Sequence, residues 1–399
     1  MKIERKEYFD KLIGYKDKKI IKVITGVRRC GKSTLLSMFQ DYLKTQSVSD
    51  EQIIYINFED YEFESLWDPK ALYAYLKERI IPGKMTYLIM DEIQNVKEFQ
   101  RVVDSFFIKD NIDIYITGSN AYMLSGELST LLTGRFVKIE MLPFSFYEFV
   151  QANSMEDNLE RAYQKYIETS SFPYTIHLDE KSNQVREYLK GIYDTIILKD
   201  VVSRKKIADV MMLESVIRFL ANNIGNPLST KKISDTMTSG RKINVKTVES
   251  YVSSLMESYI IYQAKRYDVK GKQYLKTLEK YYLVDIGLRN ALLGSKANTD
   301  VGHILENVIY LELIRRGYDV YIGKLDQVEV DFVAQNYNGI EYYQVSASVR
   351  DEITLERELR PLKMIQDNYP KYILTLDNDP EGDFDGIRRI NALDWLMKK

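Results

Sequence analysis

Short apolar runs alternate with amphipathic stretches along the first 150 residues. Five runs are almost continuously apolar: KIIKVITG (19–26), IIYINF (53–58), MTYLIMDE (85–92), IDIYITGS (112–119) and FVKIEML (136–142). The stretches between them have helical periodicity. Continuous apolar strands separated by helices are typical of a parallel sheet that is covered on both faces. The pattern therefore predicts an α/β fold for this part of the chain.

The pattern changes three times after this first part. Residues 151–225 show helical periodicity broken by SFPYT, and residues 226–295 combine short helices with strands rich in Lys and Tyr. From 296 to 399 a helix precedes a pair of strands and further α/β units. We therefore expect four segments: a first domain at 1–150, a helical lid or linker, a mixed module and a C-terminal α/β domain.

Composition excludes several classes of protein. The 399 residues are 45% apolar and 29% charged, which is usual for a globular chain. No run is long and apolar enough for a membrane helix, and the charged start gives no sign of a signal peptide. A single cysteine, Cys30, fits a reducing cytoplasm, and two distant histidines with no Cys/His cluster make a zinc site unexpected.

Charge is distributed unevenly along the chain. Between residues 201 and 290 there are 16 basic and 8 acidic residues, whereas the whole chain has a net charge of -2. A basic segment in an otherwise acidic chain favours a surface that faces a polyanion. The alternative is a basic face that only contacts solvent.

The stretch GVRRCGKST (26–34) fits the phosphate-binding pattern G-x-x-x-x-G-K-[ST], and it lies between a predicted strand and a predicted helix. We call it the phosphate loop. Its glycines let backbone N–H groups face phosphates, Lys32 would neutralise the β- and γ-phosphates, and Ser33 would bind Mg²⁺. Cys30 is interpreted as a small filler rather than a nucleophile. The expected nucleotide contacts are Gly26, Cys30, Gly31, Lys32, Ser33 and Thr34.

A second half of such a site follows in YLIMDEIQ (87–94), where an apolar strand ends in two acids. Asp91 would hold Mg²⁺ directly or through water, and Glu92 would orient or deprotonate the attacking water. Two adjacent acids favour hydrolysis over transfer to a small molecule. The alternative is that both acids simply end a strand in solvent.

Two further positions are candidates for catalysis. The fourth apolar run ends in ITGSNA, where Thr117, Ser119 or Asn120 could sense the γ-phosphate; we favour Asn120, although a plain turn is the alternative. Arg135 precedes the fifth strand and, in a ring or dimer, could reach the γ-phosphate of a neighbouring subunit. An exposed arginine between a helix and a strand is the alternative for Arg135.

These motifs together carry a family resemblance that covers essentially the whole chain. In order along the sequence they are GVRRCGKST, INFED, YLIMDEIQ, ITGSNA, LLTGRF and LPFSFYEF. They resemble the bacterial and archaeal AAA-type ATPases that carry a C-terminal domain of unknown function. The resemblance implies a five-stranded core of order 5-1-4-3-2, with ATP and Mg²⁺ as ligands. It implies functional roles for Lys32, Ser33, Asp91, Glu92 and Arg135.

The basic segment reads as helix, turn, helix and a hairpin with a basic tip, which is the order of a winged helix. In that fold the second helix enters the major groove of DNA and the hairpin contacts phosphates. The alternative is a lid or a protein-docking module, which Glu249 and Glu257 on the second helix favour. The candidate phosphate contacts are Lys231, Lys232, Arg241, Lys242, Lys246, Lys270 and Lys272.

The C-terminal segment is similar to the PD-(D/E)XK nuclease pattern, with Glu306 on a helix, Asp331 in VEVDFV and Gln344 in EYYQVSAS. In that pattern the acids hold Mg²⁺ and a lysine activates water or stabilises charge. Here Ser346 occupies the lysine position. Lys324 or Arg350 could substitute from nearby, but we favour a degenerate site that serves binding or folding.

The sequence thus predicts a Mg²⁺-dependent ATPase whose nucleotide state controls the winged-helix-like and nuclease-like parts. DNA is the expected polymer partner, a protein partner is an alternative, and a homo-oligomer is compatible with the role of Arg135. Two other hypotheses stay open: a nucleotide-gated adaptor with little turnover and an ATP-regulated nuclease.

Overall fold

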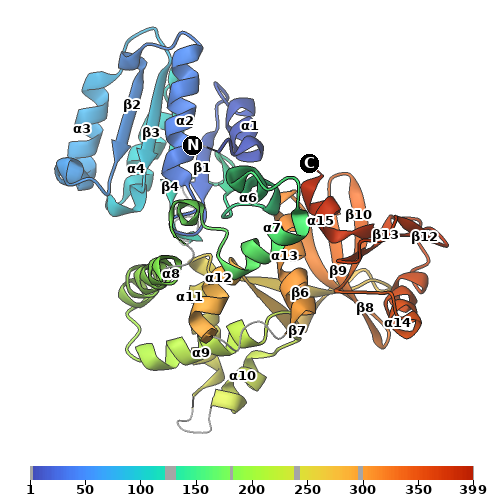
Figure 1. The fold of residues 1–399 in the computed structure, drawn as a ribbon. Coiled ribbons are helices and arrows are strands. Elements are labelled where there is room, and N and C mark those ends of the chain that lie inside the picture. The colour runs from blue at the N-terminus through green and yellow to red at the C-terminus, as the bar shows by residue number, and fades with distance from the viewer. Residues whose placement is uncertain (1–2, 122–131, 180–182, 238–242, 295–299, 399) are drawn as a thin grey trace. The chain divides into compact units, whose positions relative to one another are not determined.

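A computed structural model describes most of the chain (Figure 1). The described residues are 3–121, 132–179, 183–237, 243–294 and 300–398. The chain divides into two compact units: an N-terminal unit of Met1–Pro143 with Glu257–Tyr259, and a C-terminal unit of Phe144–Met256 with Ile260–Lys399. Among the described residues, no helix is both long and apolar enough to cross a membrane.

The N-terminal unit contains a five-stranded parallel sheet of order β2-β3-β4-β1-β5. Its strands are β1 (Ile21–Thr25), β2 (Ile53–Asn57), β3 (Thr86–Asp91), β4 (Ile112–Gly118) and β5 (Phe136–Glu140). Each strand lies within one of the five apolar runs of the sequence. The predicted α/β fold and the predicted strand order 5-1-4-3-2 are both confirmed.

Helices cover both faces of this sheet. They are α1 (Lys6–Gly14), α2 (Lys32–Thr45), α3 (Pro69–Arg79) and α4 (Phe99–Phe107). Ile114 and Ile116 of β4 belong to the core that also contains side chains of α3 and α4. Tyr115 points to the other face because side chains alternate along a strand, and its ring lies 4.7 Å from that of Phe39 on α2. The continuous apolar runs are thus explained by burial on both faces.

Helices form the first half of the C-terminal unit. In chain order they are α6 (Phe146–Asn153), α7 (Leu159–Glu168), α8 (Gln184–Thr195), α9 (Val210–Asn222), α10 (Thr230–Met237), α11 (Val245–Glu257) and α12 (Ile286–Leu293). The SFPYT break becomes a short 3-10 helix at Pro173–His177, and a π-helical stretch at Ile196–Ser203 continues α8. Later helices are α13 (Val301–Arg315), α14 (Glu352–Lys363) and α15 (Ala392–Met397).

A mixed sheet of eight strands completes the C-terminal unit, in the order β12-β13-β11-β10-β9-β8-β6-β7. Its strands are β6 (Ile261–Asp268), β7 (Gln273–Leu283), β8 (Asp319–Leu325), β9 (Val328–Asn336), β10 (Gly339–Ser346), β11 (Lys371–Thr375), β12 (Gly382–Phe384) and β13 (Ile387–Asn391). The hairpin of β6 and β7 is the one predicted as a wing. Because β6 pairs in parallel with β8, this hairpin belongs to the same sheet as the C-terminal strands.

Candidate functional site

The phosphate loop joins the end of β1 to the start of α2, as its sequence predicts. At Gly26 the backbone φ is 143°, and a Cβ atom there would lie 2.1 Å from the carbonyl oxygen of Met141. Gly31 has a φ of 102° and forms the N-cap of α2. Both positions therefore require glycine, one for space and both for backbone conformation.

Arg5, which is not part of the phosphate loop, fixes the loop by hydrogen bonds. The sequence analysis missed this role. Its guanidinium is buried and donates to the carbonyl oxygen of Cys30 at 2.9 Å. It also donates to the carbonyl oxygens of Leu142 at 2.7 Å and Pro143 at 3.2 Å. Arg5 thus ties the loop to the chain that follows β5. No local motif signals this role, because the partners lie up to 138 residues away.

Lys32 lies at the centre of the loop and is only 4% exposed. Its Nζ donates to the carbonyl oxygens of Gly26 at 3.1 Å and Val27 at 3.3 Å, and it lies 3.5 Å from Oε1 of Glu92. Burial acts to lower the pKa of Lys32, but the neighbouring Cys30, Glu92 and Asp91 raise it overall. Lys32 therefore carries its positive charge inside the loop.

Asp91 ends β3 and is fully buried. Its carboxylate accepts hydrogen bonds from the hydroxyl of Thr117 and, at 3.2 Å, from the hydroxyl of Tyr55. Burial raises the pKa of Asp91, and hydrogen bonds from Ser33 and Thr117 act against that rise. Asp91 and Ser33, the two expected Mg²⁺ ligands, thus lie together.

Glu92 follows Asp91 with a left-handed backbone (φ 53°). Its N–H donates to Oγ1 of Thr117 at 2.9 Å, and its carboxylate accepts from the side chain of Gln94. Burial acts to raise the pKa of Glu92, but Lys32 outweighs this with help from Gln94 and Arg28, so the pKa is lowered. Glu92 is therefore a buried, ionised carboxylate beside the ammonium of Lys32.

Other loop and strand-end candidates surround this pair. Arg28 pairs with Glu59 at 2.8 Å. Cys30 is buried, and burial raises the pKa of its thiol, as expected for a filler rather than a nucleophile. Asn120 is buried two residues after the end of β4, whereas Thr34 is exposed in the first turn of α2.

Arg135 precedes β5 and is 44% exposed. Its guanidinium pairs with the carboxylate of Asp104 on α4 and lies 5.7 Å from the ring centre of Phe107. An exposed ion pair of this kind contributes little to stability and opens at little cost.

The basic candidates of the middle segment lie on exposed positions. Lys231 and Lys232 are on α10, Lys246 is on α11, and Lys270 and Lys272 lie in the turn between β6 and β7. Lys270 is 3.4 Å from the carboxylate of Asp326. Arg241 and Lys242 lie outside the described residues.

The acids predicted in the C-terminal segment do converge, but around a lysine from another strand. Nζ of Lys280 on β7 lies 2.9 Å from Glu306 on α13, 2.8 Å from Glu329 and 3.7 Å from Asp331 on β9. We call these three acids the acid cluster. The hydroxyl of Tyr282 donates to Glu306 at 2.6 Å.

Gln344 does not point its oxygen towards an open position. Its Oε1 accepts from the backbone N–H of Asp331 at 2.8 Å, and its Nε2 donates to Glu358 at 2.7 Å. Among the described residues, no group of three or more His, Cys, Asp or Glu side chains is arranged to hold a metal ion.

The two suggested substitutes for the missing lysine lie at different places. Lys324 on β8 lies opposite Glu329 in the strand pairing, and Arg350 binds Asp379 at 3.1 Å. The cation of the acid cluster is Lys280, which the sequence analysis missed. The one available signal was a lysine within the apolar strand LEKYYLV.

Two proteins are similar to this chain over most of its length. An uncharacterized protein of Haemophilus influenzae is 40% identical over 401 residues, covering 99% of each chain. The uncharacterized protein MJ1544 of Methanocaldococcus jannaschii is 32% identical over 381 residues, covering 90% of this chain and 80% of its own. The chain belongs to the family of these two proteins.

Family models match two segments of the chain. Residues 18–150 match an AAA domain, and residues 160–299 match a domain of unknown function, DUF8612. The N-terminal unit is therefore an AAA-type P-loop domain. Among solved structures, the Walker-type ATPase of Pyrococcus abyssi is 15% identical, with 73% of this chain and 96% of that chain covered and a TM-score of 0.48.

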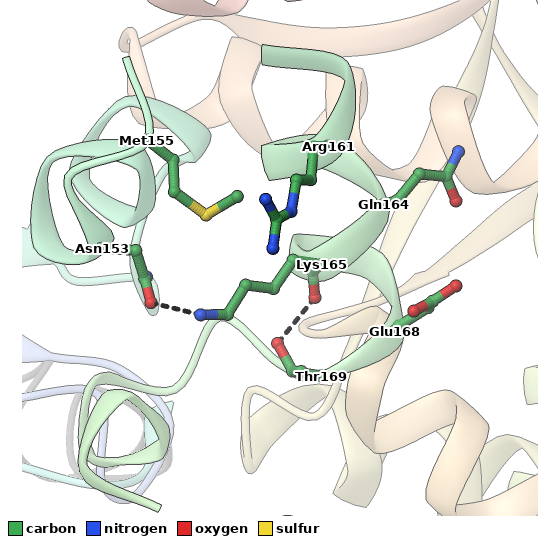
Figure 2. A pocket seen from close by; sticks show the side chains of 7 residues that line it. All are labelled: Asn153, Met155, Arg161, Gln164, Lys165, Glu168 and Thr169. Atoms are coloured by element: carbon green, nitrogen blue, oxygen red, sulfur yellow. Dashed lines mark hydrogen bonds between the residues drawn. The ribbon is translucent and has the colours of Figure 1, made fainter. Parts of the chain in front are cut away.

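The C-terminal unit has a surface hollow that is separate from the phosphate loop. It measures about 480 Å³ and contains no residue of the phosphate loop. Figure 2 shows the side chain of Lys165 directed at Asn153, to which it donates a hydrogen bond of 2.8 Å. Its lining residues are Asn153, Met155, Arg161, Gln164, Lys165, Glu168 and Thr169.

Proposed function

We propose that the AAA domain binds ATP with Mg²⁺ and hydrolyses it. The observation that carries this proposal is the grouping of Lys32, Asp91 and Glu92, in which Lys32 lies 3.5 Å from Glu92 and hydroxyls hold the adjacent Asp91. ATP hydrolysis needs a cation for the phosphates, a carboxylate for the metal and a carboxylate for the water.

The residues around the loop fit a nucleotide and a metal ion. The close approach at Gly26 and the left-handed Gly31 give the loop the tight curve that lets backbone N–H groups face phosphates. Helix α2 begins at Lys32, and a helix N-terminus favours anions. Ser33 and Asp91 supply oxygen ligands, which Mg²⁺ prefers.

Each residue then has a distinct role. Lys32 binds the β- and γ-phosphates, and Ser33 and Asp91 hold the metal. Bound Mg²⁺ neutralises charge on the phosphate oxygens. The lowered pKa of Glu92 keeps it ionised at neutral pH, so that it can orient water and accept its proton. Asn120 is the candidate for contact with the γ-phosphate.

Arg135 acts in a homo-oligomer under this proposal. Its exposure leaves it accessible to a neighbouring subunit, and its pair with Asp104 has to open before it reaches a γ-phosphate there. In GTPases an arginine of this kind contributes roughly 10³–10⁵ in rate.

DNA is the polymer that we propose for the C-terminal unit. Two helices followed by a basic hairpin place Lys231, Lys232, Lys246, Lys270 and Lys272 on exposed positions. Lysines that contact phosphates do not distinguish between bases, so we expect DNA binding with little sequence preference. Under this proposal the nucleotide state of the AAA domain controls that binding.

The test is the steady-state rate of ATP hydrolysis with Mg²⁺, measured with and without duplex and single-stranded DNA. The control is Glu92→Gln, which keeps the side-chain shape but removes the base. We expect this variant to bind a non-hydrolysable ATP analogue while losing roughly 10²–10⁴-fold in turnover.

Three results separate the hypotheses. DNA stimulation that Glu92→Gln abolishes supports a DNA-coupled ATPase. Turnover without a response to DNA keeps the ATPase and assigns the basic segment to a lid or a protein dock. No turnover above the Glu92→Gln control contradicts the ATPase and favours a nucleotide-gated adaptor.

A further inference from the structure

The acid cluster surrounds a single ammonium group. Lys280 is 4% exposed, and its Nζ lies within 4.0 Å of one oxygen from each of Glu306, Glu329 and Asp331. The three acids come from two different elements, α13 and β9. A buried ionised group needs a partner of opposite charge, so the ammonium of Lys280 and the nearly buried carboxylate of Glu306 balance one another.

Several oxygens at this position accept hydrogen bonds from within the protein. The Glu306 oxygen that meets Lys280 also accepts from Tyr282. The second oxygen of Asp331 accepts from the backbone N–H of Val345 at 2.9 Å. The amide oxygen of Gln344 is held by the backbone N–H of Asp331. Magnesium requires near-octahedral oxygen ligands at about 2.1 Å, whereas here the ammonium of Lys280 takes the point where one oxygen of each acid meets.

We propose that Lys280 is an internal cation that takes the place of a divalent metal in the acid cluster. The ammonium joins β7 to α13 and β9, so the C-terminal unit folds at this centre without a metal ion. The acid cluster is then a structural tie and does not cleave phosphodiesters. This inference is independent of ATP hydrolysis, and its experiments contain no ATP.

The wild-type protein provides the first test. Thermal unfolding is measured in chelator and in Mn²⁺, beside the variant Asp331→Asn. We expect Mn²⁺ to shift the Tm of both proteins by the same amount, because Mn²⁺ does not enter the acid cluster. A shift of the wild-type Tm that Asp331→Asn abolishes would overturn the proposal, as would Mn²⁺-dependent DNA cleavage that this variant abolishes.

Removing the ammonium provides the second test. Lys280→Met leaves the acid cluster without its cation, and we expect the Tm to fall by about 10 °C. We also expect this variant to gain stabilisation by Mn²⁺, and the double variant Lys280→Met with Asp331→Asn to lose that gain. A folded Lys280→Met protein that gains no stabilisation from Mn²⁺ contradicts the proposal. If Lys280→Met does not fold, the comparison of wild type with Asp331→Asn in Mn²⁺ still tests the proposal.

Lys22 offers a matched control. It is a buried lysine of the AAA domain that pairs with one carboxylate, Asp113, rather than three acids. Lys22→Met should also lower the Tm, but it should not gain stabilisation by Mn²⁺. A similar gain in both variants would overturn the assignment to the acid cluster.

Discussion

At the scale of single residues, two hydroxyl groups fix the carboxylate of Asp91. Tyr55 comes from β2 and Thr117 from β4, the two strands on either side of β3. Thr117 has a second task, because it accepts the backbone N–H of Glu92 at 2.9 Å. The two neighbours of Asp91 therefore orient its carboxylate, and Tyr55 is a positioning residue.

Replacing these two residues should have unequal effects. Tyr55→Phe removes one hydrogen bond of about 1 kcal/mol, so we expect about a fivefold higher Mg²⁺ concentration for half-maximal ATP hydrolysis. Thr117→Val removes a hydrogen-bond donor to Asp91 and leaves the N–H of Glu92 buried without its acceptor. We therefore expect a larger increase in the Mg²⁺ concentration for half-maximal hydrolysis, together with a lower kcat. Titrations of Mg²⁺ at saturating ATP measure both. Equal Mg²⁺ dependence in Tyr55→Phe and wild type would show that Tyr55 does not position Asp91.

Asp331 should make stability depend on pH. Burial and the nearby Glu306 raise the pKa of Asp331 to about 8. The folded state then holds a proton that the unfolded state releases near pH 4, so this group's stabilising contribution is lost as pH rises through 8. We expect wild-type stability to fall by at most about 1.4 kcal/mol per pH unit between pH 5 and 8 through this group.

The control for this prediction is Asp331→Asn, which cannot titrate. Its free energy of unfolding, measured with denaturant from pH 5 to 9, should lack that fall. Parallel curves for the two proteins would show that Asp331 is already ionised below pH 5.

At the scale of elements, the phosphate loop packs against the chain that follows β5. Gly26→Ala would place Cβ 2.1 Å from the carbonyl oxygen of Met141 and strain a backbone with φ at 143°. We expect loss of ATP binding and a destabilisation of several kcal/mol, because backbone and not a flexible side chain has to move.

Gly83 is the matched control for Gly26. Its φ is 76°, but a Cβ there would meet no atom within 4 Å. Gly83→Ala should therefore cost only about 1 kcal/mol and leave ATP binding unchanged. Thermal unfolding and binding of a fluorescent ATP analogue distinguish the two variants. If both lose ATP binding to the same degree, close packing at Gly26 is not the cause.

The elements of the AAA domain were predictable because their signals are local. Each apolar run became one strand, and the phosphate loop, Asp91 and Glu92 follow directly from strand ends. The pairing of Lys265 with Tyr321 between β6 and β8 was not predictable, because the sequence of a strand does not indicate which distant strand it pairs with. The roles of Arg5, Tyr55 and Lys280 were missed for the same reason.

At the scale of the whole molecule, charge distinguishes the basic segment from the rest of the chain. If Lys231 and Lys232 bind DNA phosphates, replacing both by Ala should weaken binding of every DNA sequence equally. The slope of log Kd against log salt should fall by about 2. Binding measured by fluorescence anisotropy at several salt concentrations tests this.

The control for the whole-molecule prediction is Lys77→Ala, an exposed lysine on α3 of the AAA domain. It should leave the salt slope unchanged. If the slope is also unchanged when Lys231 and Lys232 are replaced, the lysines of α10 do not contact DNA phosphates.

The lysine tie in the acid cluster also has a consequence for synthesis on the ribosome. Lys280 emerges 26 residues before Glu306 and well before Glu329 and Asp331. At about 5–20 residues per second, the last of these acids is added about 3–10 s after the lysine. During that interval β7 carries a charge that it cannot bury alone. The contacts of Lys280 with all three acids therefore cannot form before β9 has been made, and a chain released before that point exposes a strand edge to its neighbours.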